Sequence, residues 1–244
     1  MSARATLATA RRVLTQLRRD RRTVAMILVV PPALIALLDW VFGEQPERFA
    51  RIGPPLVGMF PLIIMFLLTS IAMLRERTSG TLERLMSMPI AKADLLFGYG
   101  LAFALVGAVQ ATLTAGVAFG LLGLETAGPV WAVVLLAIGN ALLGMSLGLF
   151  LSAFATSEFQ AVQFMPAVII PQLLLAGLFV PREAMPPVLE RISDFLPFTY
   201  AFDGLVRVAA DDIGGRLWLD VAVVTGCIVL ALVLGATTLR RRTP

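Results

Sequence analysis

The stretch LRERTSGTLERLMSMPIAKAD, residues 74–94, is an island of charge between two apolar runs. It carries four basic and three acidic side chains, a Ser-Gly-Thr turn and a proline. On each side the chain is nearly free of charge over about 20 residues, the length that crosses the ~30 Å hydrocarbon core of a bilayer as an α-helix. The stretch therefore predicts a polar loop that joins two membrane-spanning helices.

The composition of the whole chain predicts the same class of fold. Of its 244 residues, 58% are hydrophobic and only 15% are charged. A water-soluble domain of this length would not cover so much apolar surface with so few charges. We therefore predict an all-α integral membrane protein with six transmembrane helices in a single domain, 1–244. The apolar runs that predict them are residues 23–42, 54–74, 95–123, 128–156, 161–180 and 217–239.

The distribution of basic residues predicts the orientation of these helices. If the N-terminus is cytoplasmic, the inner segments hold 14 of the 20 arginines and lysines, and the outer segments hold six. Cytoplasmic loops are enriched in basic residues, so both termini and the 75–94 loop are predicted to be cytoplasmic. Nineteen of the basic residues are arginine, a bias typical of GC-rich bacterial genomes. The predicted location is a bacterial cytoplasmic (inner) membrane, which the chain crosses several times.

The first 22 residues carry seven arginines, with apolar residues between them at helical spacing. This pattern is typical of an amphipathic helix that lies along the inner membrane surface. A merely basic tail is the alternative. The apolar face of the helix would consist of Leu7, Ala10, Leu14 and Leu17.

Rows of small residues recur every four positions in the third and fourth predicted spans. Such rows let helices approach closely in lipid, where packing drives helix association. We predict a helix-packing role for them, with a substrate-lining role as the alternative. The glycines concerned are Gly116 and Gly120 in the third span, and Gly144 and Gly148 in the fourth.

The sequence holds few groups that could carry out catalysis. It has no histidine and one cysteine, Cys227, and it lacks the GxxxxGK[ST] loop that binds nucleotide phosphates. The run DGLVRVAADD, 203–212, partly resembles the acidic signature of phosphatidyltransferases, but its arginine comes one position early. We therefore predict a non-catalytic chain that binds no cofactor or metal of its own. A lipid-modifying enzyme is the alternative.

Within the charged loop, the run TSGTLERLMSMP, 78–89, predicts a short helix. Ser79 or Thr81 would cap its N-terminus, and the closing proline would end it. A helix of fewer than ~12–15 residues is marginal in water, so a partner is needed to order it. Its apolar face would hold Leu82, Leu85 and Met86, and its polar face Glu83 and Arg84.

Two runs together resemble the permease subunits of type-2 ABC exporters, which include daunorubicin-resistance-type drug exporters and polysaccharide exporters. The runs are RERTSGTLERLMSMPIAKADLLFGYG, 75–100, and AGLFVPREAMPPVLERISDFLPFTYAFDGLVRV, 176–208. The resemblance covers essentially the whole chain. It implies an ATP-driven exporter of an amphipathic substrate, such as a drug, a lipid or a lipid-linked glycan. A membrane assembly factor that does not transport is the alternative.

The same resemblance implies the partners of the chain. A second permease copy would complete a homodimer or a related heterodimer, and two ATP-binding subunits would bind ATP and Mg²⁺. No ATPase domain is fused to this chain, so the ATPase is expected as a separate polypeptide. The apolar runs make the lipid bilayer a further partner. No nucleic acid is expected as a partner, because the basic residues lie at the membrane flanks.

The resemblance also implies roles for individual segments and residues. The segments are an interfacial helix at 1–22, spans one and two at 23–74, a cytoplasmic coupling loop and helix at 75–94, spans three to five at 95–180, an outer re-entrant helical segment at 181–216, span six at 217–239 and a cytoplasmic tail at 240–244. The residues implied to dock into the ATPase are Glu76, Gly80, Thr81, Leu82, Glu83, Arg84, Leu85 and Met86. The outer segment is apolar and rich in proline, so its aromatic side chains are expected to dip toward the bilayer and close the exit path. These are Phe195, Phe198 and Tyr200.

Overall fold

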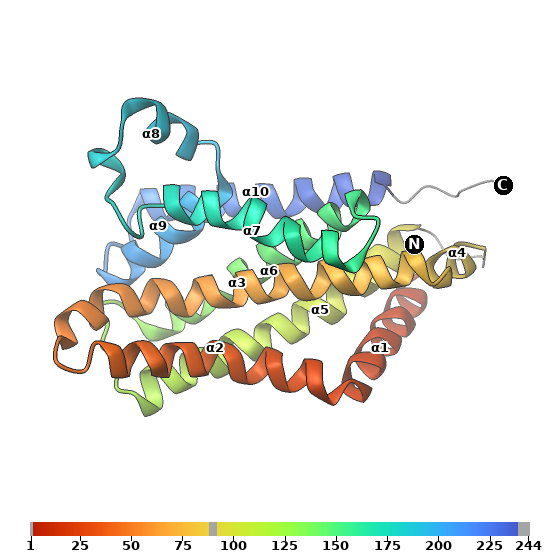
Figure 1. The fold of residues 1–244 in the computed structure, drawn as a ribbon, viewed down its shortest axis with the longest axis horizontal. Helices are drawn as coiled ribbons and strands as arrows, with labels where there is room; N and C mark the ends of the chain where they lie inside the picture. Colours follow the sequence, from red (N-terminus) through yellow and green to blue (C-terminus); the bar gives the residue numbers. More distant parts are fainter. Residues whose placement is uncertain (1, 88–91, 239–244) are drawn as a thin grey trace.

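The computed structural model describes residues 2–87 and 92–238, apart from the side chains of residues 82, 83, 86, 92 and 93. Every regular element within that part of the chain is helical. Among the described residues, six helices are long and apolar enough to span a membrane. These helices run along a common axis (Figure 1). The predicted class, an all-α integral membrane protein with six transmembrane helices, is confirmed.

The six spanning helices begin and end within five residues of the predicted spans, with one exception at the start of the second. They are α2 (Arg21–Val41), α3 (Pro46–Thr78), α5 (Lys92–Ala115, continued by a π-helical turn at Gly116–Leu121), α6 (Val130–Leu151), α7 (Glu158–Leu175) and α10 (Gly215–Thr238). The exception is α3, which begins at Pro46 and contains Pro54 and Pro55 in its interior. The first turns of α3 carry Glu47, Arg48 and Arg51, so they lie outside the apolar run from which the span was predicted.

The close packing of α3 against α6 organises the centre of the bundle. A Cβ atom built on Gly144 would lie 2.0 Å from the carbonyl oxygen of Leu62, and one on Gly148 would lie 2.4 Å from that of Phe66. The hydroxyl of Thr69 donates across the same interface to the Met145 carbonyl at 3.1 Å. Only glycine allows the two backbones to approach so closely.

The small-residue row on α5 is placed differently. A Cβ atom built on Gly116 or on Gly120 would meet no atom within 4 Å in the part of the chain that the structure describes. Both glycines are exposed, so any helix that packs on this row comes from outside the described chain.

One end of the bundle carries the N-terminal helix α1 (Ala3–Arg19) and the short helix α4 (Thr81–Met86); we call it the α4 end (Figure 1). The predicted N-terminal helix is therefore present. Its inner face carries Thr9, Ala10 and Val13, which are buried, whereas Leu7 of the predicted apolar face is exposed. The reason is that α1 packs tightly against α5, where a Cβ atom on Gly98 would lie 2.5 Å from the Cβ of Thr9.

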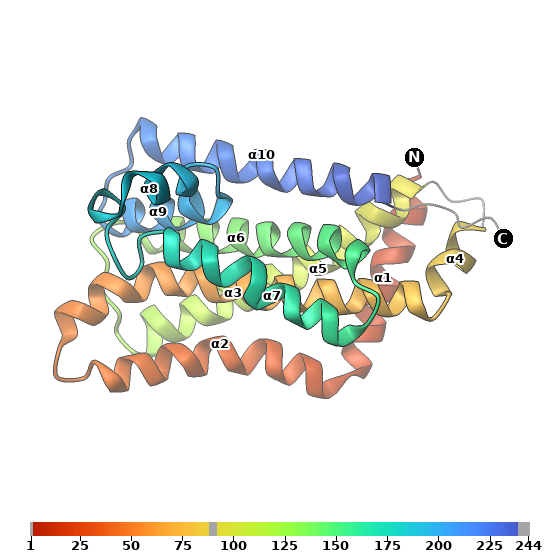
Figure 2. The ribbon, with the colours of Figure 1, turned by 45° about the horizontal axis from the view of Figure 1, so that its top comes forward.

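The opposite end carries α8 (Pro187–Ser193) and α9 (Pro197–Ala209); we call it the α9 end. α9 lies alongside α10 and α6, while α8 stands off the bundle (Figures 1 and 2). One face of α9 is buried in the apolar cluster of this end, through Phe198, Ala201, Leu205 and Val208. In the segment between the fifth and sixth spans, α9 is therefore packed against the bundle, whereas α8 is mostly exposed.

Candidate functional site

The charged loop leaves the bundle at the end of α3 through a tight turn. Ser79 closes α3 by donating its N–H to the Arg75 carbonyl at 3.0 Å, and Gly80 follows with a φ of +71°. Residues with a side chain rarely adopt that backbone conformation, so glycine permits the turn. The Gly80 carbonyl then accepts the first hydrogen bond of α4, from the Arg84 N–H at 3.1 Å. Gly80, rather than Ser79 or Thr81, therefore occupies the N-cap position.

Three consecutive side chains at the end of α3 each reach a different neighbouring helix. The first is Arg75, which binds both carboxylate oxygens of Glu158 at the start of α7. Its Nε lies 2.8 Å from Oε1, and its Nη2 lies 3.0 Å from Oε2. The two side chains are about half exposed, so the pair is an accessible link between α3 and α7.

The second side chain, Glu76, points toward α1 and α5. Its Oε1 lies 3.2 Å from Nη1 of Arg12 on α1. The same guanidinium donates through Nη2 to the hydroxyl of Tyr99 on α5, and it lies 5.6 Å from the centre of the Tyr99 ring. Tyr99 is fully buried and Glu76 largely so. The three residues therefore form an enclosed polar cluster that joins α1, α3 and α5.

The third side chain, Arg77, points toward α10. Its Nη2 donates a long hydrogen bond, 3.4 Å, to the hydroxyl of Thr238 in the last turn of that helix. The end of α3 is thus connected to α7, α1, α5 and α10 within one helical turn.

The remaining residues implied to dock into an ATPase occupy varied positions. Arg84 is exposed, and Thr81 is half-buried. Leu85 is half-buried and packs against the chain's own apolar cluster between α1, α3, α5 and α6. The side chains of Leu82, Glu83 and Met86 lie outside the described residues. The short helix is therefore ordered in part by its own chain, through Leu85, and Arg84 is available at its surface.

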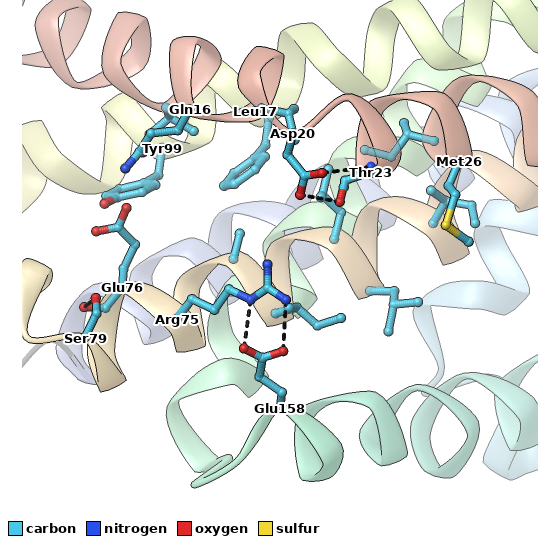
Figure 3. Close-up of a pocket in the computed structure, with 18 of the residues that line it drawn as sticks. Gln16, Leu17, Asp20, Thr23, Met26, Arg75, Glu76, Ser79, Tyr99 and Glu158 are labelled. Atoms are coloured by element: carbon cyan, nitrogen blue, oxygen red, sulfur yellow. Dashed lines mark hydrogen bonds and ion pairs between the residues drawn. The ribbon is translucent and has the colours of Figure 1, made fainter.

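A cleft of about 860 Å³ lies beside this region, between α1, α2, α3, α5 and the start of α7. Figure 3 shows the Arg75–Glu158 pair on one side of the cleft and Asp20 on the opposite side. Asp20 caps α2, accepting from the N–H of Thr23 at 3.1 Å and from its hydroxyl at 2.6 Å. The hydroxyl bond of Thr23 chiefly lowers the pKa of Asp20, so its carboxylate is ionised at neutral pH.

At the α9 end, the three aromatic residues expected to close the exit path lie in three different environments. Phe198 is fully buried, and Phe195 is 88% exposed. Tyr200 is half-buried, and its hydroxyl donates to the carbonyl of Asp194 at 2.8 Å. Within the described chain these residues are therefore not gathered into one plug.

Arg182 forms hydrogen bonds and ion pairs that connect different parts of the outer segment. Its Nε donates to the Ser193 hydroxyl at 2.9 Å, its Nη1 lies 3.0 Å from Oδ2 of Asp203, and its Nη2 pairs with Asp194. Burial raises the pKa of Asp203, and the Arg182 charge opposes that rise. The guanidinium therefore joins the turn after α7 to the end of α8 and to α9.

Arg207 links α9 to α10 in the same way. Its Nε lies 3.0 Å from Oδ2 of Asp220, and its Nη1 lies 3.3 Å from Oδ2 of Asp212. Asp220 is buried, so this contact supplies a partner for a carboxylate at the start of a membrane-spanning helix.

Sequence reasoning missed the partners in these contacts. Arg12 was one of seven N-terminal arginines, and Glu158 lay in the short link between the fourth and fifth predicted spans. One signal was available: Tyr99 is one of only two tyrosines in the chain and lies in an otherwise apolar run. A buried tyrosine hydroxyl needs a hydrogen-bond partner, which its sequence neighbours do not provide.

The model of the family described as ABC-2 type transporter matches residues 4–209 of this chain. The chain is 24% identical over 206 residues to ABC transporter G family member 20 of Dictyostelium discoideum, covering 83% of this chain and 28% of that protein. It is 25% identical over 188 residues to the probable multidrug ABC transporter permease YbhR of Escherichia coli, covering 73% of this chain and 50% of the relative.

A third relative is the linearmycin resistance permease protein LnrN of Bacillus subtilis. It is 25% identical over 156 residues, which cover 63% of this chain and 40% of LnrN. The chain therefore spans half or less of the length of these relatives. Since the family match extends over most of the sequence and the fold agrees with it, the chain belongs to the ABC-2 type transporter family.

Proposed function

We propose that this chain is the membrane-spanning permease subunit of an ATP-driven exporter. It would form the path for an amphipathic substrate, such as a drug, a lipid or a lipid-linked glycan. A second permease copy would complete the path, and two separate ATP-binding subunits would bind ATP and Mg²⁺ and supply the energy. The α4 end would face the cytoplasm of a bacterial inner membrane, in keeping with the bias of basic residues toward that end.

The observation that carries the proposal is the way α4 is joined to the bundle. The turn at Gly80 fixes α4 to the end of α3, and Arg75, Glu76 and Arg77 connect that end to four further helices. A partner that moves α4 therefore acts on most of the bundle at once. This is what a subunit driven by a separate ATPase requires.

The docking contact is expected to depend mainly on apolar anchoring. Exposed ion pairs contribute only ~0–1 kcal/mol each, whereas burying a leucine side chain contributes ~1.5–3 kcal/mol. Leu82→Ala is therefore expected to weaken ATPase binding more than Arg84→Glu or Glu83→Lys. Leu85 is unsuitable as a decisive test, because it packs into the chain's own core and its loss also lowers stability.

The experiment is co-purification with a separately expressed ATP-binding subunit, together with ATP hydrolysis by the reconstituted complex. Leu82→Ala, Glu83→Lys and Arg84→Glu are compared with Arg191→Glu, a matched reversal of an exposed arginine at the other end of the molecule. Membrane insertion is checked for each. If the three α4 variants bind and stimulate the ATPase as the parent does, the coupling role is wrong.

Two further measurements test the rest of the proposal. Stimulation of ATP hydrolysis by a drug, a lipid or a lipid-linked glycan separates a transporter from an assembly factor, which would respond to none of them. Reporter fusions after Arg84 and near Glu190 test the orientation, with a cytoplasmic signal expected at the first position and an outside signal at the second.

A further inference from the structure

The cleft beside α3 has an apolar wall and a polar mouth. Its volume, about 860 Å³, is within the ~300–1,000 Å³ range of small-molecule sites. The wall is aliphatic, and its residues come from two membrane-spanning helices, so it lies at membrane depth: Met26, Ile27 and Val30 of α2, and Leu67, Leu68 and Ile71 of α3. The polar groups gather toward the α4 end of the same cleft (Figure 3). This division matches an amphiphile, whose apolar body and polar head require different surroundings.

The charges that line the cleft are not balanced. Arg75 is the one lining guanidinium among the described residues, and it stands between two lining carboxylates. Arg75 binds both carboxylate oxygens of Glu158. Asp20 therefore has hydrogen bonds from Thr23 but no ion pair in the described chain. The third lining carboxylate, on Glu76, is already paired with a guanidinium of α1. The mouth therefore has a net negative charge.

Four arginines flank Asp20 in the sequence but do not line the cleft. Arg18, Arg19, Arg21 and Arg22 are exposed, and they are not among the residues that line the cleft. At a membrane surface such side chains attract the phosphates of anionic lipids. Within the cleft itself, the unbalanced group is the carboxylate of Asp20.

We propose that the cleft binds one amphiphilic molecule with a cationic head group, with the head beside Asp20, on the side away from Arg75, and the apolar body against α2 and α3. The assignment deepens the proposed function, on which it rests, because it gives the chemical class of molecule that the permease takes up from the α4 side. Its recognition element is a carboxylate at the mouth of an apolar cleft.

The test is protection of a cysteine in the cleft, in the full chain reconstituted in phosphatidylcholine nanodiscs with Cys227 replaced by serine. Met26→Cys reports on the cleft, and Leu37→Cys is the matched control, because both side chains are exposed on α2 but only Met26 lines the cleft. The reaction with a membrane-permeant maleimide is followed while dodecyltrimethylammonium, dodecanol or dodecyl sulfate is added. The cationic probe should slow labelling at Met26→Cys saturably and leave Leu37→Cys unchanged.

The variant Asp20→Asn isolates the charge. Asparagine caps helices as well as aspartate does, so α2 keeps its N-cap while the carboxylate charge is removed. A single charge pair at water-like dielectric corresponds to about fivefold in a dissociation constant, so Asp20→Asn should weaken protection by the cationic probe by about that factor. Protection by dodecanol should stay as it was.

Three results would overturn the assignment: equal protection by the anionic and cationic probes, equal protection at Leu37→Cys, or unchanged protection in Asp20→Asn. The measurement needs no ATPase. A negative result therefore leaves coupling through α4 standing, and a failure of coupling leaves the binding result standing.

Discussion

Arg75 and Glu158 form a two-point ion pair that joins the last turns of α3 to the first turn of α7. The side chains are 57% and 52% exposed, so the pair is solvated and contributes little to stability. Its position is more informative than its energy. It lies one residue before Glu76, which holds α1 and α5, and at the mouth of the cleft. A weak, accessible contact at this point can separate without disturbing the core.

We expect a double-mutant cycle to measure a small stabilising interaction between Arg75 and Glu158. Arg75→Glu and Glu158→Arg each replace an attraction of ~0.2–1 kcal/mol with a like-charge repulsion of similar size, and should lower the unfolding temperature by about 1–8 °C. The combined swap should recover part of the loss. The recovery is incomplete because a basic residue at the N-terminus of α7 faces the positive end of the helix dipole. If the destabilisation of the double variant equals the sum of the two single destabilisations, the ion pair contributes nothing to stability.

Gly144 should tolerate no side chain. Gly144→Ala places a Cβ atom 2.0 Å from the Leu62 carbonyl oxygen, so α6 and α3 must separate. Overpacking of this kind costs ~1–3 kcal/mol. Gly139→Ala is the control on the same helix, since its Cβ meets no atom within 4 Å in the described chain and alanine favours the helix by ~0.5–1 kcal/mol. Thermal unfolding in detergent should show a loss for Gly144→Ala alone.

The fold class could be predicted because it depends on patterns that are local in the sequence. Runs without charge, bounded by arginine-rich segments, predict spanning helices whatever their neighbours are. The island of charge at 74–94 likewise predicts the turn and the short helix. The start of α3 was missed, because its first turns carry charged residues and so lie outside the apolar run that predicts the span.

The candidate site could be predicted only in part, because its contacts join helices that are far apart in the sequence. Arg12 and Tyr99 are 87 residues apart, and Arg75 and Glu158 are 83 apart. Which arginine meets which carboxylate depends on the rotation of each helix about its axis, and a 3.6-residue period in a uniformly apolar span does not define that rotation.

Phe195 and Phe198 illustrate the same limit at the α9 end. Both belong to one apolar run, and the sequence alone gives them one role. In the structure Pro197 begins α9, so Phe198 faces the core while Phe195 precedes the helix and points outward. The position of one helix start separates them.

Cysteine labelling distinguishes these two positions and tests the re-entrant placement of the segment. With Cys227 replaced, Phe198→Cys should react slowly with every maleimide, because its side chain is fully buried. Phe195→Cys should react with a membrane-permeant maleimide but resist a charged one, since an exposed phenylalanine is accommodated by lipid. Fast reaction of Phe195→Cys with the charged reagent would show that this segment lies in water.

Arg182 should control the order of the outer segment. Its guanidinium contacts Ser193, Asp194 and Asp203, so it connects the end of α8 to α9, beside the hydrogen bond from the Thr199 hydroxyl to the Ser193 carbonyl. Partly exposed charged hydrogen bonds contribute ~1 kcal/mol in all after screening, so Arg182→Ala should speed amide hydrogen exchange in residues 187–196 about fivefold. Exchange in α6 and α10 should be unchanged, because their packing does not use this side chain.

The control is Arg191→Ala. It removes an exposed arginine of α8 that has no ion pair among the described residues. If both variants speed amide exchange in α8 equally, the effect follows from the loss of any arginine, and the contacts of Arg182 do not order α8.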